Sequence, residues 1–116
     1  MSPTELDLLQ GTLDVLVLRA LSWQPMHGYA IARFIRGGSG KAFRILDGAL
    51  YTSLHRMEEK GWVESEWGLS DKGKRAKFYM LTSAGRRALR SESSAWARYV
   101  EAVAGVMRAE PEPRTT

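Results

Sequence analysis

Apolar positions in the first half of the chain recur every three to four residues, which is the period of an α-helix. The Ser-Pro-Thr-Glu run at residues 2–5 has the composition of a helix start, so we expect a first helix from there to about Trp23. Its apolar stripe includes Leu6, Leu9 and Leu13 and is wide. A stripe of that width favours packing against two surfaces, one in the same domain and one in a partner subunit.

Two shorter helices are predicted next. The second begins at residue 27 or 28 and runs to about residue 36, where the glycine-rich segment 37–40 stops it. The third covers residues 48–60, with Asp47 as its N-cap and Gly61 as its stop. Both segments repeat their apolar residues with the helical period.

A helical wheel separates two faces of the third helix. Leu50, Leu54 and Met57 fall within a narrow arc, which we predict to face the core. The opposite side carries small and polar residues: Gly48, Thr52, His55, Arg56 and Glu59. Ala49 and Ser53 flank that side. Small residues permit close approach to base edges, but an ordinary solvated face has a similar composition, so the wheel alone leaves both interpretations open.

After Gly61 the period changes from 3.6 to 2. Residues 62–67 and 76–81 alternate as strands do, and the polar segment between them predicts a β-hairpin with a basic tip. Thr82 and Ser83 then cap a fourth helix of roughly residues 84–108. Its apolar seam, which ends with coiled-coil spacing, consists of Leu89, Trp96, Val100, Val103 and Met107.

Three helices followed by a basic hairpin match the winged helix-turn-helix plan, so we predict a mainly α protein with a small β-hairpin wing (α+β). The expected organisation is a winged-helix DNA-binding domain over residues 1–82 and a C-terminal dimerisation helix over residues 83–109. Residues 110–116 are expected to form a disordered tail. In this plan the third helix enters a major groove of double-stranded DNA, and the wing touches the flanking backbone or minor groove.

The charge distribution agrees with a nucleic-acid partner. The 116-residue chain has a formal net charge of +4, and its bases cluster within residues 33–44 and 72–77. Clustered positive charge attracts a polyanion and releases its counterions. The absence of cysteine excludes a disulfide framework, a thiol nucleophile and a cysteine zinc site. The acidic N-terminus and the charges that interrupt the apolar run 13–21 lead us to expect a soluble, cytoplasmic protein without a membrane partner.

Several ordered motifs resemble those of PadR-family transcriptional regulators. They are Gly-Thr-Leu at residues 11–13, His-Gly-Tyr at 27–29, the third-helix segment 47–61 and the wing segment 73–82. The resemblance covers about residues 8 to 107 and fits the short subfamily with a single C-terminal helix. Two positions depart from the family pattern. Thr52 stands where a proline is usual, and Ala76 stands where members often carry another base.

The resemblance implies a homodimer built by the first and last helices, which presents its two third helices to a palindromic operator. Members are commonly repressors, and some release DNA when a small effector binds at the dimer interface. The expected interface residues are Leu6, Leu9, Leu13, Leu89, Trp96, Val100, Val103 and Met107. Trp96 has two interpretations: it packs in the dimer core, or it forms a wall of an effector pocket on which a planar ligand stacks.

The candidate DNA contacts fall into two groups. Those expected near base edges are Ala49, Thr52, Ser53 and Arg56, with a phosphate as the alternative for Arg56, and His55 is expected to face DNA or water. Those expected at the phosphate backbone are Tyr29, Lys41, Tyr51, Lys72, Lys74, Arg75 and Lys77. The alternatives are structural: the tyrosines pack within the domain, and the wing charges only maintain solubility.

No constellation of residues predicts an enzyme. His27 and His55 are the only histidines, and neither has the spacing of a metal-binding pair or of an acid–base partner. We therefore expect no catalytic residue, no metal and no cofactor. The leading hypothesis is a DNA-binding transcriptional regulator, and the alternative is a winged-helix module that binds another protein.

Overall fold

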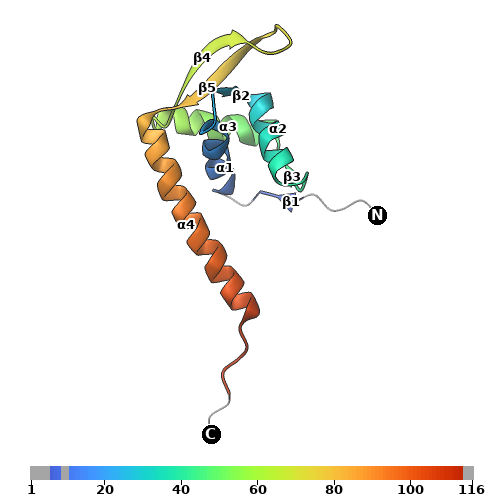
Figure 1. Ribbon diagram of the computed structural model, residues 1–116, viewed down its shortest axis with the longest axis vertical. Helices are drawn as coiled ribbons and strands as arrows, with labels where there is room; N and C mark the ends of the chain where they lie inside the picture. Colours follow the sequence, from blue (N-terminus) through green and yellow to red (C-terminus); the bar gives the residue numbers. More distant parts are fainter. Residues whose placement is uncertain (1–5, 9–10, 114–116) are drawn as a thin grey trace, which may run out of the picture.

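The computed structural model describes residues 6–8 and 11–113 of the chain. The elements are β1 (Leu6–Asp7), α1 (Thr12–Leu21), β2 (Met26–His27), α2 (Gly28–Gly38), β3 (Phe43–Arg44), α3 (Asp47–Glu59), β4 (Val63–Leu69), β5 (Arg75–Leu81) and α4 (Ser83–Arg108). Helices α1 to α3 form a body that carries the β4–β5 hairpin, and α4 leaves this body as a long arm (Figure 1). The predicted order of three helices, a hairpin and a last helix is confirmed.

The core is built around α1. Leu18 and Leu21 of α1 are at most 2% exposed and belong to one cluster with apolar residues of α2, α3 and the hairpin. The predicted core face of α3 is confirmed, because Leu50, Leu54 and Met57 are at most 1% exposed. Full burial of each such side chain stabilises the fold by about 1.5–3 kcal/mol, so this arc fixes which side of α3 faces outward.

The hairpin is joined to the helical body through a third short strand. Strands β4 and β5 pair antiparallel, from Val63 opposite Leu81 to Leu69 opposite Arg75, and both run further toward the turn than predicted. Strand β2 pairs antiparallel with the other edge of β5. Because β2 leads directly into α2, this pairing brings the N-terminus of α2 beside the wing.

The start of the chain differs from its prediction. Leu6 and Asp7 form β1, which pairs in parallel with β3, and the backbone N–H of Leu6 donates to the carbonyl of Ala42 over 2.6 Å. Gly11 has a φ of +88°, a left-handed conformation that interrupts a continuous helix, and α1 begins only at Thr12. The prediction of one helix from residue 2 to about residue 23 is therefore wrong at residues 6–7, and residues 2–5 lie outside the described part of the chain.

Two predicted helix starts had different outcomes. Thr82 caps α4 as predicted: its Oγ1 accepts from the backbone N–H of Gly85 over 3.0 Å and donates to the carbonyl of Gly61 over 2.6 Å. Asp47 is not the N-cap of α3. Leu46 occupies that position, and Asp47 is the first helical residue. The positive end of the helix dipole still stabilises its carboxylate there.

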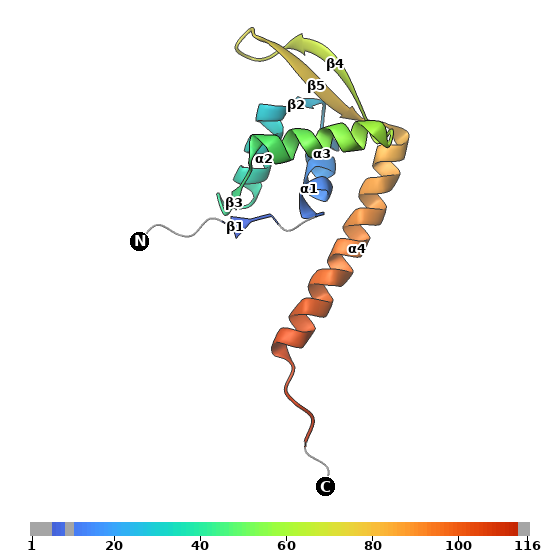
Figure 2. The same ribbon diagram turned by 180° about the vertical axis from the view of Figure 1, so that it is seen from behind.

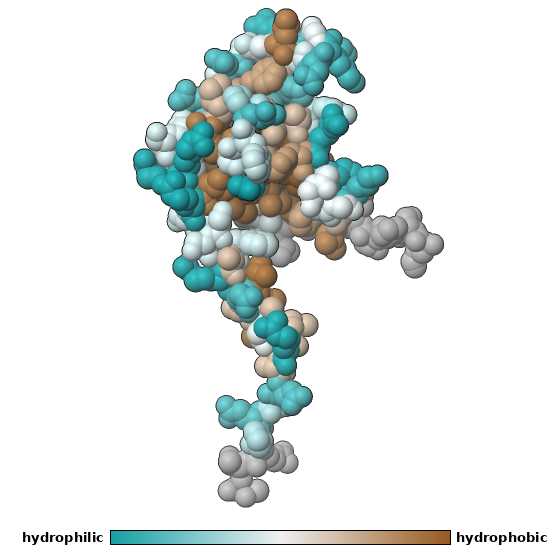
Figure 3. All heavy atoms as spheres, in the orientation of Figure 1, coloured by the Kyte–Doolittle hydropathy of each residue, from teal (hydrophilic) through white to brown (hydrophobic). Residues whose placement is uncertain are grey.

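The last helix projects beyond the body that anchors it. Its first turns pack through Gly85 and Ala88, which are buried, whereas Trp96, Val100 and Val103 are 39–45% exposed. Apolar side chains therefore lie uncovered along this arm (Figure 3). Within the described part of the chain, none of the helices combines the length and the apolar composition that crossing a bilayer requires.

Candidate nucleic-acid interface

One side of the molecule brings together α3, the start of α2 and the wing. Figure 2 shows α3 crossing the body beneath the hairpin. A hollow of about 680 Å³ lies between the N-terminus of α2 and the wing. Seven tyrosines and basic residues that line it are candidates for contacts with the phosphate backbone of DNA: Tyr29, Arg33, Tyr51, Lys72, Lys74, Arg75 and Lys77. Six of these were predicted as backbone contacts, so the structure brings most of that predicted group to one place.

Arg33 is the member of this group that sequence reasoning missed. It lies one turn after Tyr29 on α2, and its guanidinium carbon is 5.8 Å from the centre of the Tyr29 ring. Residues four apart on a helix are neighbours, so the spacing of these two residues was the available signal. Lys41 is not part of the hollow. It follows the far end of α2, an 11-residue helix, which is about 16 Å long at the usual rise.

The absence of a side chain at Gly28 leaves space for the ring of Tyr51 at the start of α2. A Cβ atom added to Gly28 would lie only 2.4 Å from the Tyr51 hydroxyl oxygen and 2.8 Å from its Cζ atom. The hydroxyl therefore rests against the Cα of the first residue of α2, while the ring remains half exposed. Nearby, Nδ1 of His27 accepts from the backbone N–H of Ala30 over 3.2 Å and caps the helix. A helix N-terminus of this kind favours an anion.

Two bases of the wing contact other side chains of the protein, and two are exposed in the turn. The Arg75 guanidinium lies 4.6 Å from the centre of the Trp67 ring, and Lys77 Nζ lies 4.0 Å from Glu58 Oε1 on α3. Lys72 and Lys74 are exposed in the turn that joins the two strands. Trp67 and Glu58 thus orient the bases nearest the body, and the tip carries two exposed ammonium groups.

The predicted base-edge residues do not all reach the surface. Ala49, Thr52 and His55 are exposed on α3, and His55 Nε2 lies 3.1 Å from Glu59 Oε1. Ser53 is only 1% exposed, and its hydroxyl donates to Oδ1 of Asp14 over 2.5 Å. The prediction that Ser53 approaches base edges is therefore wrong, because this flank of α3 faces α1.

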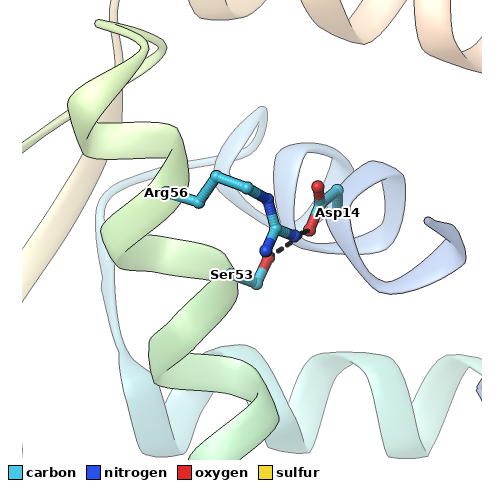
Figure 4. Close-up of polar contacts among 3 residues, drawn as sticks. All are labelled: Asp14, Ser53 and Arg56. Atoms are coloured by element: carbon cyan, nitrogen blue, oxygen red, sulfur yellow. Dashed lines mark hydrogen bonds and ion pairs between the residues drawn. The ribbon is translucent and has the colours of Figure 1, made fainter. Parts of the chain in front are cut away.

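Arg56 is tied to the same carboxylate. Its Nη2 donates to Asp14 Oδ1 over 2.5 Å, so Ser53 and Arg56 of α3 converge on one oxygen of α1 (Figure 4). The hydrogen bond to Asp14, followed by its coulombic attraction, raises the pKa of Arg56 above the usual arginine value. Asp14 was no candidate site residue in the sequence, where it is one of the charges that interrupt the apolar run 13–21. A lone acid among buried residues is the signal that it had a partner elsewhere in the fold.

The structure places the predicted dimer residues in different surroundings. Leu13 and Leu89 are partly buried against the core of their own subunit. Leu6 is 54% exposed in β1, and Leu9 lies outside the described residues. The remaining four are exposed on α4 in the single chain: Trp96, Val100, Val103 and Met107.

Among the residues whose placement is described, no group of three or more His, Asp or Glu is arranged to hold a metal ion.

Comparison with known proteins gives a consistent result. The model of the "Transcriptional regulator PadR-like family" matches residues 17–91. Uncharacterized protein X of Lysinibacillus sphaericus is 34% identical over 98 residues, which are 84% of this chain and 89% of that protein. An uncharacterized 37.1 kDa protein in transposon Tn4556 of Streptomyces fradiae is 43% identical over 85 residues, 73% of this chain but 23% of that protein.

Solved structures also resemble the chain over most of its length. A PadR family transcriptional regulator from Eggerthella lenta has 30% identity and a TM-score of 0.72, covering 87% of this chain and 86% of that one. A PadR family transcription regulator from Clostridium difficile has 29% identity and a TM-score of 0.69, covering 85% of this chain and all of that one (100%). The predicted α+β winged-helix fold is therefore confirmed.

Proposed function

Because this chain belongs to the PadR-like family of transcriptional regulators, we propose that it binds operator DNA as a homodimer and regulates transcription by occupying that site. The predicted family resemblance is confirmed by the family match. One observation carries the proposal: the outward face of α3, the N-terminus of α2 and the bases of the wing all border one side of the molecule. Thr52 and His55 lie where base edges would approach, and Tyr29, Tyr51 and the wing bases lie where phosphates would.

The exposed seam of α4 supports the dimer. Trp96, Val100, Val103 and Met107 are 39–79% exposed, and Tyr99 and Val106 add further exposed apolar surface beside them. Their spacing suits a helix–helix seam, and burying such a stripe against a second copy removes apolar surface from water. A two-fold dimer would present two copies of α3 to half-sites about 34 Å apart, which corresponds to a palindromic operator.

Blocking of polymerase is the regulatory outcome that we propose. In this proposal the body formed by α1 to α3 and the wing occupies the operator, and α4 joins two such bodies. Occupation of an operator is sufficient for repression, whereas activation needs an additional productive contact. A reporter gene placed behind the selected operator tests the direction of control: expression falls if the chain represses and rises if it activates.

Trp96 supports a second function, the sensing of a small planar molecule at the dimer interface. Its side chain is 45% exposed on α4, and a flat aromatic surface within an apolar seam stacks well on planar ligands. Quenching of Trp96 fluorescence by planar compounds, with release of bound operator, would support this function. Quenching that is unchanged in Trp96→Phe would assign the signal to another tryptophan.

Selection from a pool of random duplexes tests the proposed function directly. The purified chain is expected to enrich a palindromic site, and binding to it is then measured by mobility shift over a range of salt concentrations. The variant Lys72→Gln/Lys74→Gln should weaken binding, whereas Arg86→Gln/Arg87→Gln removes two exposed bases from α4 and should not. A chain that retains no duplex at low salt would contradict the proposal and favour a protein-binding module.

A further inference from the structure

We propose that Asp14 of α1 sets the DNA sequence preference of this regulator by positioning Arg56 of α3. The inference rests on the proposed function, because it concerns how the same DNA-binding surface discriminates between bases. Asp14 and Arg56 are 42 residues apart in the sequence and belong to different helices. Their contact is therefore a product of the fold and not of local spacing.

The three residues of this cluster form a gradient from the core to the surface. Ser53 is 1% exposed, the Asp14 side chain is 16% exposed and the Arg56 side chain is 44% exposed. The buried hydroxyl fixes the carboxylate, and the same carboxylate oxygen holds one amino group of the guanidinium (Figure 4). One end of the guanidinium is thereby anchored to α1, while a large part of the side chain stays at the surface.

An anchored guanidinium still has donors available for a base. Arginine carries five N–H donors in a rigid fork, and the contact with Asp14 occupies Nη2. Recognition of guanine needs two N–H groups directed at its O6 and N7 atoms. A side chain already held in place also loses less conformational freedom when it binds than a free arginine does. The cluster thus preorganises Arg56 for a base edge.

The carboxylate also discourages the competing contact with phosphate. A free arginine on a DNA-facing helix is attracted to the nearest phosphate, and such contacts carry no sequence information. Pairing with Asp14 makes the local charge close to neutral, so the attraction to a phosphate is reduced. Hydrogen-bond donation to a neutral base edge depends less on net charge and is retained. Asp14 therefore shifts Arg56 from phosphate binding toward base reading.

The surroundings of the pair suit this role. A second hollow, of about 450 Å³, is lined by Asp14, Ala49, Thr52 and Arg56 among others, and it opens beside the small residues of α3. Small side chains there allow another molecule to come close to the guanidinium. His55 of α3 also contacts an acid, Glu59, whereas Lys72 and Lys74 are exposed in the turn of the wing.

The test compares variants in the selection experiment on random duplexes. Asp14→Asn removes the charge and keeps the shape, so Arg56 is released. We expect about tenfold less discrimination at one base pair of each half-site, equivalent to one good bidentate contact, with unchanged or tighter binding to random DNA. Asp71→Asn, in the exposed turn of the wing, removes the same charge without touching Arg56. It should tighten general binding and leave discrimination as in the wild type.

A second variant keeps the test decisive if Asp14→Asn folds poorly. Arg56→Lys retains the positive charge but lacks the fork, so it should lose the same discrimination while random-DNA binding stays within about twofold. Adding Asp14→Asn to Arg56→Lys should then change discrimination no further, because Asp14 acts through the guanidinium. Chemical unfolding of every variant shows whether it is folded under the binding conditions.

Each outcome has a definite meaning. If the wild type selects a site and either single variant selects it with equal discrimination, the role of Asp14 is refuted and the proposed function stands. If Asp14→Asn lowers discrimination as much in the Arg56→Lys background as alone, Asp14 does not act through Arg56 and the inference also fails. If the wild type selects no sequence at all, the proposed function fails and this inference fails with it.

Discussion

Replacing Gly28 by alanine should displace the Tyr51 ring while leaving the stability of the fold nearly unchanged. The new Cβ atom would lie 2.4 Å from the Tyr51 hydroxyl oxygen and 2.8 Å from Cζ. Since non-bonded atoms pack at about 3.5 Å or more, the end of the ring must move by about 1 Å. The ring is half exposed and therefore free to move outward, whereas the backbone of α2 is held by β2 and its cap.

The expected effect on binding is larger than the effect on folding. A hydrogen bond from the Tyr51 hydroxyl to a charged phosphate contributes about 1.5 kcal/mol, so displacing it should weaken DNA binding about tenfold. Alanine is favoured over glycine by about 0.5–1 kcal/mol in the middle of a helix and by less at the first residue of α2, so this gain offsets part of the strain of moving an exposed ring. The free energy of unfolding of Gly28→Ala should then stay within about 1 kcal/mol of the wild type.

The assay pairs mobility shift with urea unfolding, and the chain offers a matched control. Gly37 lies in the same helix, and a Cβ added there meets nothing within 4 Å, so Gly37→Ala should stabilise the fold and leave DNA binding unchanged. Tyr51→Phe should reproduce the loss caused by Gly28→Ala, and combining the two should cost little more than either alone. Wild-type affinity in Gly28→Ala would refute the idea that this glycine positions a phosphate-binding hydroxyl.

Gly85→Ala should destabilise the fold by about 3 kcal/mol in chemical unfolding, because its Cβ would lie 2.0 Å from the carbonyl oxygen of Trp62; Gly105→Ala, which meets nothing within 4 Å, is the control. Val103→Asp should halve the mass measured by sedimentation, since it places a charge in the proposed α4 seam; an unchanged mass would place the interface elsewhere. Lys74→Gln should reduce the slope of log affinity against log salt by about one unit, and an unchanged slope would reject a phosphate contact.

Periodicity predicted most of the fold because the corresponding signals lie within single elements, although the elements are stabilised by contacts between them. The arc of Leu50, Leu54 and Met57, the alternation of the hairpin strands and the cap at Thr82 can each be recognised in one short stretch of sequence. The start of the chain followed a different rule. The Ser-Pro-Thr-Glu run has the composition of a helix start, but Gly11 takes a left-handed conformation and residues 6–7 pair with β3. A strand of only two residues is too short to show the alternating pattern of a strand, and its partner β3 lies more than 30 residues away in the sequence.

The candidate site was predicted where exposure follows from the helical wheel, and it was missed where packing decides. Ala49 and Ser53 flank the same side of α3 on the wheel, yet only Ser53 is buried, because α1 crosses that flank and supplies Asp14. Arg56 was predicted as a free base-reading side chain, whereas the structure pairs it with the same carboxylate. A wheel describes one helix in isolation, so it contains no information on which neighbour covers a flank.

The arrangement of charges suggests that the wing and α3 contribute differently to DNA binding, the wing to general affinity and α3 to discrimination between base sequences. Arg56 and His55 of α3 each meet an acid of the same chain, whereas Lys72 and Lys74 are exposed at the wing tip. Because the Asp14 carboxylate neutralises Arg56, that pair should release few counterions from DNA, while each tip lysine that meets a phosphate releases about one. If the chain binds DNA as proposed, rising salt should therefore weaken the contribution of the wing and spare hydrogen bonds from α3 to bases. Discrimination by this regulator should accordingly persist at salt concentrations where binding to random DNA has been lost.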